Sequence, residues 1–104
     1  MPYIKREDRA RIEACQTMLA LLPSGGPNNA GELNFTITML LHNYLQRIGV
    51  SYLHLNEVIG ILECAKMELY RQIAAPYEDK KKQENGSISG LDDNSHSELW
   101  DRYE

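Results

Sequence analysis

The sequence predicts a small all-α domain of three helices with an extended N-terminal arm. Apolar residues recur at steps of three and four over residues 5–22, 32–48 and 52–75, which is the period of amphipathic helices. A run rich in Pro and Gly separates the first two segments, and Gly49 separates the second from the third. The long third segment is apolar on two sides, so we expect it at the centre of the fold or at a subunit interface.

Chain length and charge limit the classes of function. At 104 residues the chain forms a small domain, for which oligomerisation is an effective way to bury more apolar surface. Residues 1–77 contain seven acidic and seven basic side chains, so the net charge of -4 arises wholly from residue 78 onward. A neutral body lacks the cluster of Lys and Arg that nucleic-acid binding requires, which disfavours nucleic acid as a partner. We expect a helical domain over residues 1–84 and an acidic, largely flexible tail over 85–104.

The N-terminal residues and the cysteines indicate a cytoplasmic protein. The first residues lack the apolar segment of a secretory signal, and no apolar run approaches the roughly 20 residues of a membrane span, so no membrane partner is expected. Cys15 and Cys64 both fall on apolar helix faces. This placement is typical of buried free thiols in a reducing compartment, and a disulfide is the less favoured alternative.

The first two helices are joined by a long loop. Pro2 biases the chain start toward an extended arm, and the run PSGGPNNAG over residues 23–31 ends the first helix. We interpret this loop as a connector in preference to a contact loop. In the second helix, Phe35, Met39 and His42 lie off the main apolar stripe at i, i+4 and i+7. They form either a contact with the loop or arm, or a second subunit interface; the two readings carry equal weight.

The third helix begins after a short connection and reaches Pro76. Gly49 is expected to end the second helix and Ser51 to cap the third. Pro76 lacks an N–H and clashes with the carbonyl of Gln72, so the helix should kink or stop there, with an extension over residues 77–84 left open. In the tail, Leu99, Trp100 and Tyr103 form a small apolar group that would dock on the body or on a partner.

No constellation of catalytic or metal-binding residues is visible, so we expect no cofactor and no enzyme activity. The three histidines are scattered, and neither Cys-x-x-Cys nor His-Glu-x-x-His occurs. The polar and small residues that line the less apolar flanks of the third helix are the remaining candidates for a ligand site or interface: Asn56, Gly60, Glu63, Lys66, Tyr70, Arg71 and Tyr77. The favoured interpretation is a structural polar network, for example Glu63 with Arg71. The functional interpretation is a pocket in which Lys66 and Arg71 meet an anion and a tyrosine stacks on a ring.

Several stretches together resemble an uncharacterised family of short proteins from bacteriophages and prophage-like elements. They are MPYI at residues 1–4, GELNFTIT at 31–38, LNEVIGILECAK at 55–66, ELYR at 68–71, APYEDKK at 75–81 and NG at 85–86. The chain departs from the family in a longer loop at residues 23–30 and in the tail beyond Gly86. The resemblance implies a phage origin and no particular activity.

The sequence therefore favours a non-enzymatic phage accessory protein that acts in the host cytoplasm through protein–protein contacts, as a homodimer or higher oligomer. Its further partner would be a host or phage protein. The alternative is a protein that binds or sequesters a nucleotide signal through four residues near a subunit interface, Lys66, Tyr70, Arg71 and Tyr77. A third hypothesis is a DNA-binding helix-turn-helix around Gly49, which is disfavoured because basic residues are absent from the helix that would read the groove until Lys66.

Overall fold

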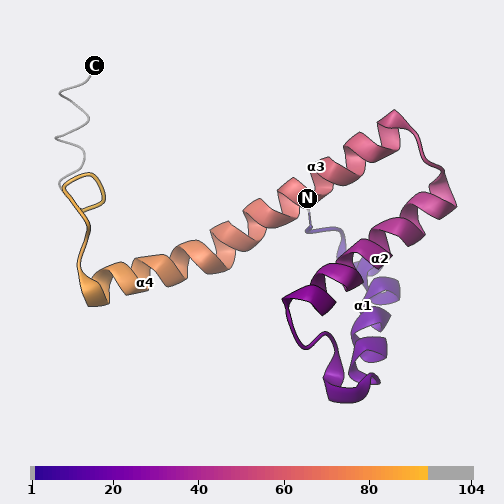
Figure 1. Ribbon diagram of the computed structural model, residues 1–104, viewed down its shortest axis with the longest axis horizontal. Coiled ribbons are helices and arrows are strands. Elements are labelled where there is room, and N and C mark those ends of the chain that lie inside the picture. The colour runs from indigo at the N-terminus through magenta and orange to yellow at the C-terminus, as the bar shows by residue number, and fades with distance from the viewer. Residues whose placement is uncertain (1, 94–104) are drawn as a thin grey trace. The chain divides into compact units, whose positions relative to one another are not determined.

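A computed structural model of the chain describes residues 2–93 and confirms the all-α class (Figure 1). Between these residues the structure contains no strand. The elements, in chain order, are α1 (Arg6–Ala20), a 3₁₀ turn (Pro23–Gly25), α2 (Ala30–Ile48), α3 (Tyr52–Leu69), a π turn (Tyr70–Ala74) and α4 (Ala75–Asn85). Leu99, Trp100 and Tyr103, the apolar group expected to dock, lie outside the described residues.

The chain divides into two units, Met1–Ala65 and Lys66–Glu104, and the division falls inside α3. The first unit holds α1, α2 and most of α3. The second holds the end of α3, the π turn, α4 and the turn that follows it. The domain boundary that composition places after residue 84 stays a prediction.

Hydrogen bonds from side chains fix the start of α2. The Asn29 side chain accepts a bond from the Glu32 backbone N–H at 2.9 Å, and the Glu32 carboxylate accepts from the Asn28 backbone N–H at 3.1 Å and from the Asn29 amide at 3.2 Å. This reciprocal arrangement satisfies N–H groups that the first helical turn cannot pair. Because of it, α2 begins at Ala30, two residues before the start predicted from the apolar pattern.

The connection between α2 and α3 confirms the caps expected from the sequence. Gly49 ends α2 with φ 99°, a left-handed conformation that glycine adopts without steric cost, and its N–H donates to the Leu45 carbonyl at 2.8 Å. The Ser51 hydroxyl accepts a bond from the His54 backbone N–H at 3.1 Å. The His54 ring nitrogen Nδ1 donates to the Gly49 carbonyl at 2.7 Å, which ties the new helix to the end of the old one.

The third helix does not end at Pro76 but continues to Asn85 through a π turn. In this turn the Ala75 N–H donates to the carbonyl of Tyr70, five residues earlier. A proline in a regular α-helix clashes with the carbonyl four residues before it, here that of Gln72. We attribute the π turn to Pro76, because the wider turn moves that carbonyl away from the proline ring. Pro76 then lies in the first turn of α4, where a missing N–H is tolerated.

The apolar faces predicted to form a core remain largely exposed. Among residues 2–93, Val58 is the only buried hydrophobic side chain, with 5% of its surface exposed. Phe35 is 70% exposed and Ile59 is 60% exposed, although both lie on apolar sides of their helices. The described part of one chain therefore does not cover the third helix, and its expected place at a subunit interface stays a prediction.

Candidate interaction surfaces

The residues proposed from the sequence as one ligand or interface cluster fall into both units. Asn56, Gly60 and Glu63 belong to the part of α3 in the first unit. Lys66, Tyr70, Arg71 and Tyr77 belong to the second unit. Whether the seven residues form a common site stays a prediction.

The surroundings of Gly60 differ from those that the sequence led us to expect. A glycine inside a helix costs about 1 kcal/mol relative to alanine, which led us to expect close approach of another helix or a ligand. A Cβ added at Gly60 would meet no atom within 4 Å. Within the described residues nothing approaches this position, so the small residue leaves room along α3.

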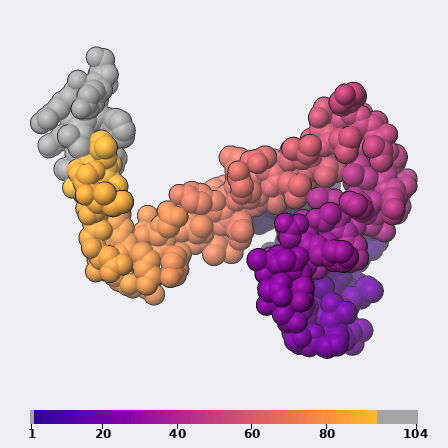
Figure 2. Space-filling view, viewed as in Figure 1, coloured from indigo at the N-terminus to yellow at the C-terminus, as the bar shows by residue number. Residues whose placement is uncertain are grey.

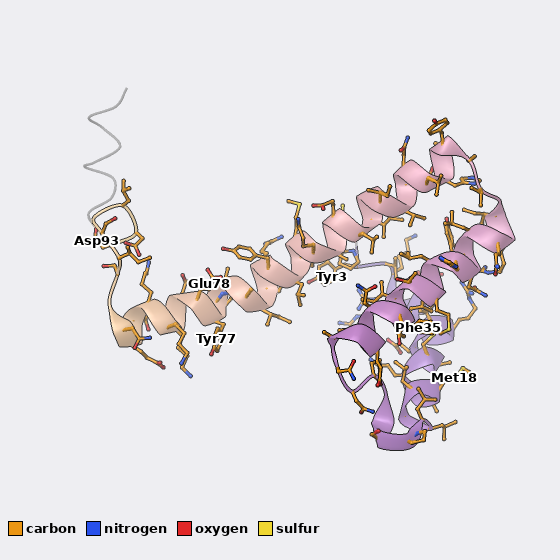
Figure 3. The ribbon with its side chains drawn as sticks, viewed as in Figure 1. Tyr3, Met18, Phe35, Tyr77, Glu78 and Asp93 are labelled. Atoms are coloured by element: carbon orange, nitrogen blue, oxygen red, sulfur yellow. The ribbon has the colours of Figure 1, made fainter. Side chains whose placement is uncertain are left out.

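The tyrosines of the second unit make separate local contacts. The Tyr70 hydroxyl donates to the Glu78 carboxylate at 3.4 Å, and the Lys81 ammonium lies over the Tyr77 ring at 5.6 Å from its centre. Figure 3 shows Tyr77 and Glu78 pointing away from different sides of the helix, so Tyr70 and Tyr77 do not share one side. Both rings remain more than half exposed.

An apolar hollow lies beside two of the three residues predicted as a second interface. It has a volume of about 270 Å³ and is lined by the end of α1, the loop and the first turns of α2, namely Leu19, Leu22, Gly26, Pro27, Glu32, Phe35, Thr36 and Met39. Phe35 is 70% exposed and Met39 52%. His42, the third predicted member, is exposed and lies one turn further along α2. The structure thus brings the loop and the Phe35–Met39 pair together.

A second hollow in the first unit lies between α2 and α3. Its volume is about 350 Å³, and its lining is Ala30, Leu33, Asn34, Ile37, Thr38, Leu41 and Leu62. Leu33, Ile37 and Leu41 belong to the main apolar stripe of α2, which the sequence assigns to the core, and Leu62 lies on α3. Leu33 is 52% exposed and Ile37 41%. The apolar surfaces of α2 and α3 therefore face a shared space without filling it.

Sequence reasoning missed an ordered turn after α4. The Asp92 carboxylate accepts bonds from the backbone N–H groups of Ile88 at 3.0 Å and Ser89 at 2.9 Å, and the Lys82 ammonium donates to the Asp92 carbonyl at 2.8 Å. The bonds from Ile88 and Ser89 hold the pKa of the Asp92 carboxyl below its ordinary value. The signal available in the sequence was a serine followed three residues later by an acid, Ser89 and Asp92, which is the spacing of a capping box.

Both cysteines are free thiols, as expected, but their surroundings differ. Cys64 is half-buried, whereas Cys15 is exposed. The prediction that Cys15 is buried is therefore wrong, because α1 has no neighbouring helix close enough to cover its apolar face.

Over residues 2–93, no group of three or more His, Cys, Asp or Glu side chains is arranged to hold a metal ion. None of the described helices combines the length and the hydropathy needed to cross a bilayer.

The comparison with protein families identifies the class of this protein. Residues 1–88 match the family described as "Domain of unknown function (DUF6899)", and the chain belongs to that family. This confirms the resemblance to an uncharacterised family; the phage origin stays a prediction. The match ends just after α4, so the family unit includes the π turn and Pro76. Neither the curated proteins nor the solved structures contain a match to this chain.

Proposed function

We propose that this protein acts without catalysis, through protein–protein contacts, and that it does so as a homo-oligomer. The observation that carries the proposal is the exposure of its apolar helix faces. Each unit presents such a face: Phe35 and Met39 in the first, and Leu69, Ile73 and Tyr77 in the second, all at least half exposed. Soluble monomers rarely expose contiguous apolar patches of this kind unless the patch binds something.

Burial of these apolar faces is energetically favoured over their exposure to water. Complete burial of one Leu, Ile, Phe or Met side chain contributes about 1.5–3 kcal/mol relative to its exposed state. With one buried apolar side chain among residues 2–93, a single copy gains little of this term. Small domains whose core is insufficient commonly oligomerise. Association with identical copies supplies the missing burial without any other factor.

Size-exclusion chromatography with light scattering tests the proposal. We expect the full chain at micromolar concentration to elute with the mass of a dimer or a larger assembly of the 11.9 kDa subunit. Dilution should lower the apparent mass and the helicity measured by circular dichroism together, since the helices gain stability from association. A folded, concentration-independent monomer would contradict the proposal.

The further partner is proposed to be a protein of a phage or of its bacterial host, acting in the host cytoplasm. What supports this part is the resemblance to phage and prophage proteins. Affinity capture from phage-infected and uninfected cells, followed by competition with the purified untagged chain, would identify such a partner. Capture of no protein that the untagged chain displaces would count against it.

A further inference from the structure

The second unit presents a straight apolar stripe on a helix that has no helical neighbour within that unit. Leu69, Ile73 and Tyr77 stand four residues apart and are 59%, 63% and 60% exposed. A regular α-helix has about 3.6 residues per turn, so a step of four drifts around its axis. The π turn at residues 70–74 holds more residues per turn, and it brings these three side chains back toward one line.

This segment cannot cover its stripe with its own unit. Residues 66–85 form one helix, coloured from salmon to orange in Figure 2, and the described part of this unit contains no second helix. In proteins most of the stability of a helix comes from packing of its apolar face. The stripe therefore needs an occupant from outside the unit, and the charges at its ends indicate which one.

We infer that the stripe binds the same segment of a second copy in antiparallel orientation, with Ile73 against the partner subunit's Tyr77. This inference rests on the proposed homo-oligomer and names its interface. In this register Lys66 faces the partner subunit's Glu84, and by two-fold symmetry Glu84 faces the partner subunit's Lys66. In the same register Leu69 faces the partner subunit's Lys81. The interface thus has an apolar centre of two Ile73–Tyr77 contacts, a Leu69–Lys81 contact on either side of it, and an opposite-charge pair at each end.

Other pairings of the same helix place like charges together. A parallel pair sets Lys66 against Lys66 and Glu84 against Glu84. An antiparallel pair shifted to place Ile73 against itself sets Lys66 against the partner subunit's Lys80. Like charges across a helix interface are unfavourable and opposite charges determine orientation and register. Glu84 is within 3.3 Å of Lys81, but both side chains are nearly half exposed, and an exposed pair of this kind exchanges partners at little cost.

Charge reversal at the two ends tests the register. Lys66→Glu and Glu84→Lys each replace two attractive contacts per dimer by two repulsive ones, so each should raise the dimer dissociation constant at least tenfold at low salt. The double variant restores both pairs and should return the constant to within about threefold of the wild type. Residues 66 and 84 are about 27 Å apart along one helix, so such a rescue cannot arise within one chain. Asp79→Lys is the matched control, because it makes the same charge change as Glu84→Lys on a different side of the helix.

Sedimentation velocity over a concentration series, at 50 mM and 500 mM NaCl, provides the measurement. An equimolar mixture of the two single variants should form a heterodimer at wild-type strength, which native mass spectrometry resolves by mass when one of the variants is uniformly labelled with nitrogen-15. If the wild type associates but the single variants resemble Asp79→Lys, this register is wrong while the homo-oligomer survives. If the singles weaken the dimer and the double variant fails to restore it, the antiparallel pairing is overturned. A wild type that stays monomeric overturns the proposed function as well.

Discussion

Both units hold their helices and turns with local hydrogen bonds, but they differ in the apolar neighbours that their own segments supply. In the first unit, α2 begins with the Asn29–Glu32 cap and α3 begins with the Ser51 cap. In the second, Tyr70 bonds Glu78 and Asp92 closes the turn after α4. The first unit has two apolar hollows between its own segments. The second has one helix and no internal neighbour. The comparison shows that local hydrogen bonds define helices without determining what covers them.

The largest expected effect is at the centre of the second unit's stripe. Ile73→Asp places a charge where apolar contact is proposed, and it should weaken self-association by at least about 2–3 kcal/mol, since it removes buried area and buries an unpaired carboxylate. The Gln72→Asp variant adds the same charge one residue away. Sedimentation velocity should show a monomer for Ile73→Asp and an oligomer for Gln72→Asp. If both variants stay oligomeric, the association is assigned to the first unit instead.

A second variant separates helix stability from the alignment of the stripe. Pro76→Ala removes the cause of the π turn, so the helix should become regular and its helical signal in circular dichroism should rise. In a regular helix Tyr77 moves out of line with Leu69, and self-association should weaken by about 1–2 kcal/mol, the value of about one apolar contact. A variant that is both more helical and more strongly associated would show that the π turn does not align the interface.

A smaller effect is expected at the start of α2 in the first unit. Asn29→Ala removes the side chain that accepts the Glu32 N–H, and it should cost about 1 kcal/mol of unfolding free energy. Asn28→Ala is the matched control, because Asn28 contributes only its backbone N–H to the Glu32 carboxylate. Urea unfolding at one fixed protein concentration compares the two. Equal midpoints would mean that the cap contributes nothing measurable.

The smallest effect is a local dependence on pH after α4. The pKa of Asp92 is lowered in the folded chain from an ordinary value of 3.8, so the ionised carboxylate favours the turn above that value. This contribution disappears as the pH falls through the folded pKa, below 3.8. NMR spectra recorded from pH 6 to pH 2 should show the Ile88 and Ser89 amide signals shifting together in that lower range. In Asp92→Asn these two signals should show no such transition.

Much of the helical framework was predictable because its signals are short-range. Gly49 and Ser51 act as caps through bonds to residues three or four positions away, and the sequence places both correctly. Pro76 was recognised as a break in the α-helical pattern, but the π turn that absorbs it was missed. The reason is that the break can be resolved by a stop, a kink or a wider turn. Local sequence does not rank these outcomes, and the structure shows that the wider turn is the one adopted.

The candidate site was less predictable, because a site depends on residues that are distant along the chain. Phe35 and Met39 were singled out from their spacing, and the structure adds Leu19, Leu22 and the loop residues around Gly26 to the same hollow. Gly60 suggested a close neighbour that the described chain does not supply. Spacing reveals that a face is apolar, but it carries no information on which segment or which copy of the chain lies against it.

The sequence by itself determined the all-α class, the caps at the α2–α3 connection, the free state of both cysteines and membership of an uncharacterised family. These follow from interactions within a few residues and from direct similarity of the chain. Only the tertiary structure decided that the third helix continues through Pro76 to Asn85, that Asp92 orders the following turn, and that the apolar faces stay uncovered in one copy. The physical reason is that burial is shared between distant surfaces, so its extent is settled only when those surfaces are placed in space.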